Sequence, residues 1–364
     1  MSSTKPPGAP LPQTSSVAPG AGLKMRHLGI LNPRTWFVRG PAQLVPERAG
    51  RTSKFDRFLD LGIYAALIVL FIFFSQASPY FLTERNLVNV GAAVAVTGIL
   101  AAGMTIALVA GQLDLTVGAN VGIVSVVVAL GVSTWHVGTA PAVILGLLTG
   151  VIIGVVNTIL VVKVHINSII ATLAFSIVLR GAALIFTNGQ VKPLIDPTLQ
   201  NFVSYQVLTI PVSVLILIVI YILGWIMLTF TRSGWHIYST GGNPSASQRA
   251  GIKIGRVYFG VFIVTGVLAA VGGVITAGNA GSGGPAYANG AEFDVLTAVL
   301  LGGIGLAGGS GRIQRTLAGV LVIGILNNGL TLLSVNTYYQ QLARGAVFVL
   351  AVVLAAISEQ RRSR

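Results

Sequence analysis

Carboxylates are scarce in this chain, so the position of each one carries information. Nine of the 364 residues are Asp or Glu, whereas 54% are hydrophobic. Asp114 lies in AGQLDLTVGAN, residues 110–120, between two long apolar runs. A carboxylate at bilayer depth costs roughly 2.5–3.5 kcal/mol on insertion scales, so it tends to be functional or bonded to backbone donors. The segment is predicted to be a re-entrant gate element or a cap on the next helix, and the two interpretations are compatible.

Further small and polar residues extend this candidate pathway. Several follow Asp114 closely, where a broken helix needs partners for its freed backbone groups. Residues 150–162 and 319–333 resemble each other, since each has small residues, then an Asn, then an apolar exit. This likeness indicates two related halves of about five spans, a common transporter arrangement. The residues predicted to form the translocation pathway and its gate are Asp114, Thr116, Gly118, Asn120, Asn157 and Asn327.

Residues 241–252, GGNPSASQRAGI, form a short polar segment between two apolar runs. Asn243 is a good N-cap, and Pro244 suits the first helical position. A helix of about two turns is predicted, with Ala246 and Ala250 on one small face. Because so short a helix is not stable alone, flanking helices and whatever receives that face must hold it. The pattern leaves open an ordinary interfacial loop helix and a docking site.

Two acidic residues open a later apolar run. Glu292 and Asp294 begin the eighth predicted span at its outer end, where negative charge suits a helix N-terminus. A docking role for a partner outside the membrane is the more specific alternative. The candidate docking residues are Glu84, Glu292 and Asp294.

Enzymatic signatures are absent from the sequence. No Lys follows a Gly, which excludes a P-loop, and neither HExxH nor GxSxG occurs. The four His lack metal-ligand spacing, and there is no Cys. We therefore expect no catalytic residue, metal site or cofactor in this chain. If ATP drives uphill transport, another chain must bind the ATP and Mg²⁺.

The elements that must position these residues are membrane helices. Charged residues make up 9% of the chain, against about 25% in soluble domains. Apolar runs near 20 residues recur, as bilayer-spanning helices require. The sequence predicts an all-α polytopic membrane protein with about ten transmembrane helices. Their estimated ranges are about 59–75, 89–110, 117–134, 141–162, 167–187, 207–230, 257–277, 294–307, 316–334 and 342–357.

Lys and Arg set the expected orientation. The formal net charge is +14, and the basic residues gather in alternate loops and at both ends. Because Lys and Arg favour cytoplasmic loops, both termini are expected to be cytoplasmic. Residues 1–58 are predicted to be a disordered basic tail, with a lipid-binding basic segment as an alternative. Residues 59–358 then form the transmembrane domain, and residues 359–364 a cytoplasmic tail.

Several motifs together resemble a known family. They are residues 110–120 and 241–252 together with YFLTERNLVNV (80–90), EFDVLTAVLLGG (292–303), LAGGSGRI (306–313) and NNGLTLLSVNTYYQQLARG (327–345). Over roughly residues 59–358 the chain resembles permease subunits of bacterial ABC importers for ribose, xylose, galactose and related sugars. In that family the matching GGN loop contacts the ATPase. The residues implied here are Gly241, Gly242, Asn243, Pro244, Ala246, Ala250, Gly251 and Ile252.

The resemblance implies transport without covalent chemistry. An extracytoplasmic binding protein would deliver a monosaccharide to two permease chains, identical or different, in the lipid of the bacterial inner membrane. Partner ATPase subunits would move the coupling segment, and no nucleic acid is involved. The residues that depart from the usual family pattern are Leu113, Thr116, Ile304, Gly305 and Arg315. The alternatives are an ABC permease for an amino acid or other small solute, and a stand-alone secondary transporter that uses Asp114.

Overall fold

The computed structural model describes the backbone of residues 54–362 and the side chains of residues 62–360. Most of the predicted N-terminal tail therefore lies outside the described residues. Helix begins at Lys54 and continues to Arg362, so it includes residues 54–58 and 359–362 of the two predicted tails. The boundaries of the transmembrane domain stay a prediction.

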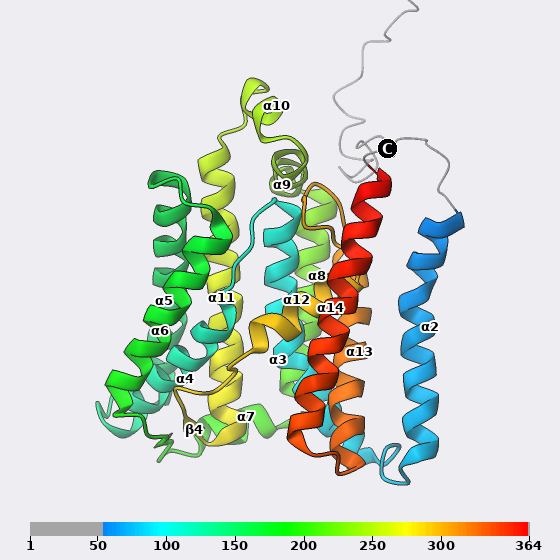
Figure 1. The fold of residues 1–364 in the computed structure, drawn as a ribbon. Coiled ribbons are helices and arrows are strands. Elements are labelled where there is room, and N and C mark those ends of the chain that lie inside the picture. Colours follow the sequence, from blue (N-terminus) through cyan, green and yellow to red (C-terminus); the bar gives the residue numbers. More distant parts are fainter. Residues whose placement is uncertain (1–53, 363–364) are drawn as a thin grey trace, which may run out of the picture. The chain divides into compact units, whose positions relative to one another are not determined.

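Helices account for most of the described chain, and they run side by side with α10 beyond one end and α7 at the other (Figure 1). In chain order the elements are α2 (Lys54–Ala77), α3 (Glu84–Val109), α4 (Val117–Ser133), α5 (Thr139–Thr158), the π turn η2 (Ile159–Lys163), α6 (Ser168–Thr187), β1 (Lys192–Pro193), α7 (Thr198–Ser204), β2 (Gln206–Val207), β3 (Ile210–Pro211), α8 (Val212–Phe230), α9 (Arg232–Gly242), α10 (Pro244–Arg249), α11 (Ile254–Ala280), β4 (Ser282–Gly283), α12 (Ala291–Leu301), α13 (Ile313–Leu332) and α14 (Thr337–Arg362).

A helix occupies each of the ten ranges predicted from hydropathy, although they differ in length. Within the described residues, seven helices are long and apolar enough to cross a membrane. Helix α12 has 11 residues and is therefore about 17 Å long, which is too short for a hydrocarbon core of about 30 Å. The eighth predicted span is thus a short helix that begins within the bundle.

Helices α3 and α11 form the centre of the bundle, and each packs against partners from the other end of the sequence. Helix α11 packs on α4 and α5, whereas α3 packs on α12 and α13. Close approach between α11 and α5 depends on small residues, because a methyl group on Gly266 would overlap the carbonyl oxygen of Gly150. Helix α3 thus packs on helices from the C-terminal part of the chain, and α11 packs on helices from its N-terminal part.

Short strands and a polar turn lie at the end of the bundle opposite α10. Lys192 of β1 pairs with Gly283 of β4, and β2 pairs with β3. Near β1, Asp196 accepts hydrogen bonds from the hydroxyl groups of Thr139 and Thr198. These hydrogen bonds hold the pKa of the Asp196 carboxyl below its ordinary value, and the bond from Thr139 has the largest effect. They tie the start of α5 to the start of α7.

Candidate functional site

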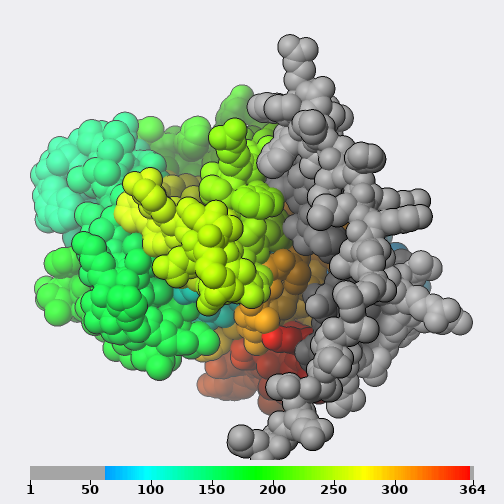
Figure 2. Space-filling view, turned by 90° about the horizontal axis from the view of Figure 1, so that it is seen from above, coloured from blue at the N-terminus to red at the C-terminus, as the bar shows by residue number. Residues whose placement is uncertain are grey.

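The predicted polar helix between the two apolar runs is present as α10. The Asn243 side chain accepts from the Ala246 N–H over 2.9 Å, and Pro244 occupies the first turn. Gly251 follows with φ +86°, a conformation that favours glycine. Ala246 and Ala250 are exposed, and Figure 2 shows α9 and α10 at the surface of this end of the bundle. The predicted capped helix is therefore present, and what receives its small face stays a prediction.

Three backbone segments meet beneath α10 at glycine residues. A methyl group on Gly241 would overlap the carbonyl oxygen of Val109, the last residue of α3. The Gly309 N–H donates to the same carbonyl over 2.9 Å. Gly111, just after α3, lies against Gly308 in the turn after α12. The end of α9, the turn after α12 and the segment before α4 are therefore in direct backbone contact just below α10.

Asp114, in that segment, is fully buried and accepts four hydrogen bonds. Its Oδ1 accepts from the N–H of Thr116 at 3.0 Å, from its hydroxyl at 2.5 Å and from the amide of Asn157 at 3.3 Å. Its Oδ2 accepts from the Thr265 hydroxyl at 2.6 Å. The carboxylate thus joins the start of α4 to α5 and α11. The N-cap residue of α4 is Thr116, and Asp114 stabilises this helix start by accepting hydrogen bonds from the N–H and hydroxyl of Thr116.

The irregular backbone around Asp114 also has partners on α6. The Leu113 N–H donates to the Ser168 hydroxyl over 3.2 Å, and the Leu115 N–H donates to the Thr172 hydroxyl over 3.1 Å. Non-helical backbone at membrane depth is tolerated where protein groups satisfy it. The predicted break between two helices is therefore present, and it is fixed from α5, α6 and α11 together.

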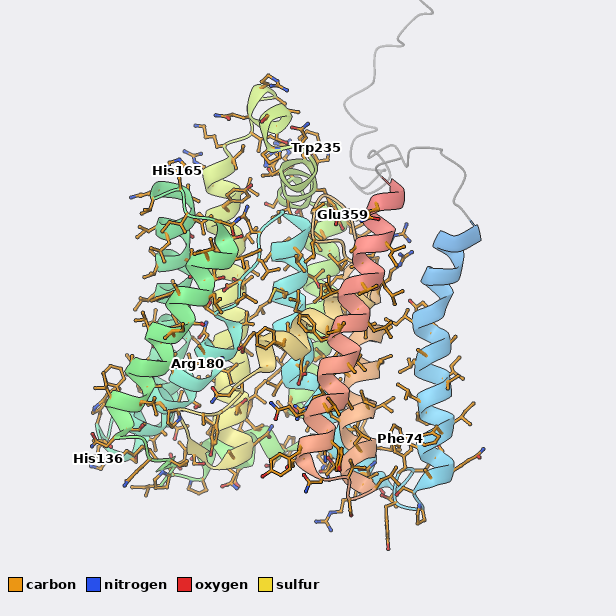
Figure 3. All side chains as sticks on the ribbon, viewed as in Figure 1. Phe74, His136, His165, Arg180, Trp235 and Glu359 are labelled. Carbon is orange, nitrogen blue, oxygen red and sulfur yellow. The ribbon has the colours of Figure 1, made fainter. Side chains whose placement is uncertain are left out.

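The start of α12 carries two ion pairs. The Arg180 guanidinium on α6 lies 2.6 Å from Glu292, and that of Arg344 on α14 lies 3.4 Å from Asp294. The Glu292 side chain is 5% exposed and that of Arg180 is 33% exposed. Arg180 lies between the two ends of α6 and is labelled in Figure 3. One Glu292 oxygen, Oε2, is buried without a hydrogen bond and faces Gly118. These acids lie within the bundle and pair with arginines there.

The predicted site residues fall into separate places. Around the start of α4 the structure brings together Asp114, Thr116 and Asn157. Gly118 contacts the Glu292 carboxylate, and the Asn120 amide donates to the Gly266 carbonyl. In the described part of the chain, Asn327 on α13 shares no hydrogen bond with them. Glu84 is exposed at the end opposite α10. Among the described residues no three His, Asp or Glu gather as a metal site would require.

Sequence reasoning did not assign the partners on α6 and α11 to the site. Ser168, Thr172, Ser176 and Arg180 recur every four residues, so they form one polar stripe on α6. The first three are buried, and that stripe is the signal that would have identified them. Thr265 has no comparable signal, because it stands alone among apolar residues of α11.

Together, the membrane-length helices and the buried, hydrogen-bonded break define a polytopic helical membrane protein. The chain belongs to the family described as branched-chain amino acid transport system / permease component, whose model matches residues 86–352. It is therefore a membrane permease, and the predicted family resemblance is confirmed.

Several curated relatives are named for the sugar that they transport. The chain is 37% identical to the ribose import permease protein RbsC of Escherichia coli (strain K12) over 79% of this chain and 91% of the relative. It is 38% identical to RbsC of Bacillus subtilis (strain 168), over 81% and 92%. It is 32% identical to the L-arabinose ABC transporter permease protein AraH of Azospirillum brasilense, over 91% and 97%. No solved structure matches the chain.

Proposed function

We propose that the chain is the permease subunit of an ATP-binding-cassette importer that moves a monosaccharide. An extracytoplasmic binding protein delivers the sugar, and a separate subunit binds ATP and Mg²⁺. The observation that carries this proposal is α10, a capped helix with an exposed small face. It directly follows α9, whose Gly241 contacts the backbone at the end of α3, just before the Asp114 segment. The sugar class is supported by the names of the relatives.

The orientation proposed for the chain places α10 in the cytoplasm of a bacterial cell, with both termini on that side of the inner membrane. The loops at the α10 end carry Arg232, Arg249, Lys253 and Arg256, and such loops are cytoplasmic in membrane proteins. In this orientation Glu84 lies outside the cell and is proposed to dock the binding protein.

Two related halves of five membrane helices are proposed from the exchanged packing of α3 and α11. Between the halves, corresponding helices run in opposite directions, as α3 and α11 do in Figure 1. The short helix α12 then corresponds to α4, since each follows a non-helical segment and starts within the bundle. Inverted repeats of this kind form many transporters, with the solute site where broken helices meet.

The translocation pathway is proposed to run past α6, α12 and α14. The Arg180 and Arg344 side chains are 33% and 37% exposed in the single chain, and charges this far along membrane helices do not face lipid. A second permease chain would cover this face and leave a polar path between the two chains. Glu292 and Asp294 would line that path, and the buried residues around Asp114 would support it from within the chain.

Coupling is proposed to pass through the glycine contacts under α10. When the ATPase subunits close, they displace α10, and Gly241 carries that displacement to Val109 and the segment before α4. The cavity between the two permease chains thereby changes its open side. The chain supplies binding surfaces and movement, and it performs no covalent step.

A branched-chain amino acid is the second candidate solute. The description of the matching family favours it, whereas several of the curated relatives are named for sugars. We favour the sugar because those relatives are aligned over most of both chains. A screen for solutes that stimulate the ATPase of the reconstituted complex separates the two.

Association with the ATPase tests the proposal directly. Ala246→Arg places a long charge on the exposed face of α10 and is expected to abolish co-purification of the ATPase subunit, with the fold intact. Ser204→Arg is the matched control, because Ser204 is exposed at the opposite end of the bundle. Normal co-purification with Ala246→Arg would refute the docking role of α10.

A further inference from the structure

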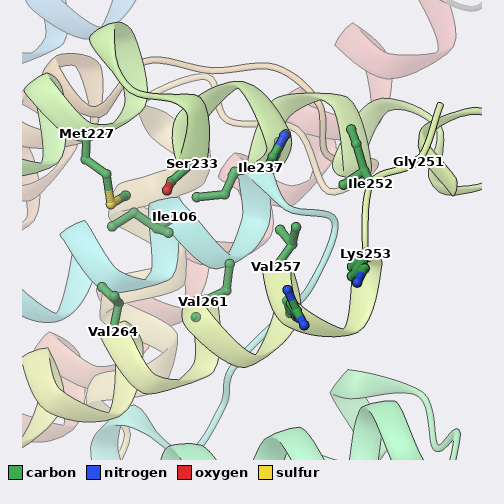
Figure 4. A pocket seen from close by; sticks show the side chains of 13 residues that line it. Ile106, Met227, Ser233, Ile237, Gly251, Ile252, Lys253, Val257, Val261 and Val264 are labelled. Carbon is green, nitrogen blue, oxygen red and sulfur yellow. The ribbon is translucent and has the colours of Figure 1, made fainter.

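A groove of about 500 Å³ opens between α3, α8, α9 and α11 near the base of α10 (Figure 4). Its inner wall is apolar and includes Ile106 of α3, Met227 of α8 and Val261 and Val264 of α11. Val264 lies ten residues beyond the first residue of α11, which is about 15 Å along the axis at 1.5 Å per residue. The groove therefore extends along α11 for about half the thickness of a hydrocarbon core of about 30 Å.

The mouth of the groove is basic. Lys253 and Arg256 line it and are exposed, and Ser233 and His236 contribute further polar groups. No acidic residue lines the groove, and in the described part of the chain neither cation forms an ion pair. Trp235, beside His236, is 40% exposed, as is usual for an indole at the boundary between lipid and water.

We propose that this groove binds one anionic phospholipid. The phosphate lies at Lys253 and Arg256, and one acyl chain extends along α11 past Val261. Basic pockets between membrane helices on the cytoplasmic side suit anionic headgroups. A folded partner domain would contact the mouth but would not fill a narrow apolar groove of this depth. The lipid also contacts Gly251 and Ile252, which connect α10 to α11.

The headgroup half of the proposal is tested by native mass spectrometry of the purified full-length chain titrated with dioleoyl phosphatidylglycerol or dioleoyl phosphatidylcholine. A basic residue near the membrane surface contributes about 1 kcal/mol, which is about a fivefold change in affinity. Lys253→Gln and Arg256→Gln are each expected to weaken phosphatidylglycerol binding about fivefold, and the double variant about 30-fold. Arg232→Gln is the control, because Arg232 is exposed at the same end and does not line the groove.

The acyl-chain half is tested by filling the groove. Gly260 lines it, and a side chain added there meets open space, so Gly260→Leu fits without strain. This variant is expected to weaken phosphatidylglycerol binding at least tenfold, whereas Gly62→Leu, which adds the same side chain in open space on α2, leaves it unchanged. Soluble glycerol phosphate at the same concentration is expected not to compete, because it lacks the acyl chain.

Equal binding of the two lipids by the wild-type chain would overturn the proposal. So would unchanged phosphatidylglycerol binding in both the double variant and Gly260→Leu. If these variants retain the lipid and instead lose the ATPase or a second copy of the chain, the groove is a protein contact. Competition by glycerol phosphate would likewise exclude a phospholipid in favour of a free-phosphate site.

Discussion

Replacing Asp114 shows whether its carboxylate is needed as a hydrogen-bond acceptor that stabilises the fold or as a negative charge that transport requires. Four donors reach its carboxylate, and two of them have a second acceptor nearby. The Thr265 hydroxyl lies 3.0 Å from the Phe262 carbonyl, and the Asn157 amide lies 3.0 Å from the Thr116 hydroxyl oxygen. For the N–H and the hydroxyl of Thr116 the structure provides no other acceptor among the described residues. The magnitude of the effect therefore depends mainly on those two groups.

Asp114→Ala orphans the buried N–H and hydroxyl of Thr116, which costs about 1–3 kcal/mol for each group. The other two bonds are worth about 0.6 kcal/mol each on the membrane-protein average. We therefore expect a loss of about 3–7 kcal/mol, seen as a lower melting temperature in detergent and reduced uptake in proteoliposomes. Glu84→Ala, which changes an exposed carboxylate, is expected to leave both unchanged.

Asp114→Asn is the decisive companion variant. Its carbonyl oxygen can still accept from Thr116, and its amide can donate to Thr265, whose own hydroxyl then donates to the Phe262 carbonyl. Stability and ATP-driven uptake are expected to stay within about 1 kcal/mol and twofold of the wild type. A stable Asp114→Asn protein without uptake would refute this reasoning, because it would show that the charge itself is required.

Three further predictions test other contacts. Gly241→Ala is expected to prevent folding, because its methyl group overlaps the Val109 carbonyl, whereas Gly242→Ala has room and stays within about 0.5 kcal/mol; yields of monodisperse protein distinguish them. Arg180→Met leaves a buried carboxylate unpaired and is expected to cost about 1–3 kcal/mol after discounting for exposure, more than Arg344→Met; the reverse order of melting temperatures would contradict this. The lowered pKa of Asp196 means that its stabilisation is complete above the unfolded-state pKa and is lost as pH falls through the folded-state pKa. Melting curves of Asp196→Asn should therefore lack that part of the acid loss seen in the wild type.

Local signals were sufficient to predict α10. The start of α10 is specified by Asn243 and Pro244, and its end by Gly251. Each of these caps involves only neighbouring residues, so the local sequence is sufficient to predict it. The break at Asp114 was likewise predictable, because a carboxylate among leucines cannot remain unpaired. Its partner Asn157 was among the predicted pathway residues, although their hydrogen bond was not predicted.

Long-range pairing was beyond the sequence. Arg180 and Glu292 are 112 residues apart, and their ion pair depends on how α6 packs beside α12. The predicted docking acids Glu292 and Asp294 are paired inside the bundle, which a terminal position in a hydropathy window does not reveal. The same window overestimated α12, because the Gly-rich residues after Leu301 are apolar enough to extend the run but form turns.

ATP-driven uptake in proteoliposomes tests the central claim most directly. The measurement compares uptake of labelled ribose by vesicles that contain this chain, its ATPase subunit and its binding protein with uptake by vesicles that contain this chain alone under an ion gradient. The account predicts monosaccharide uptake that requires ATP and all three components and that Ala246→Arg abolishes. Uptake by the chain alone, driven by the ion gradient, would contradict it.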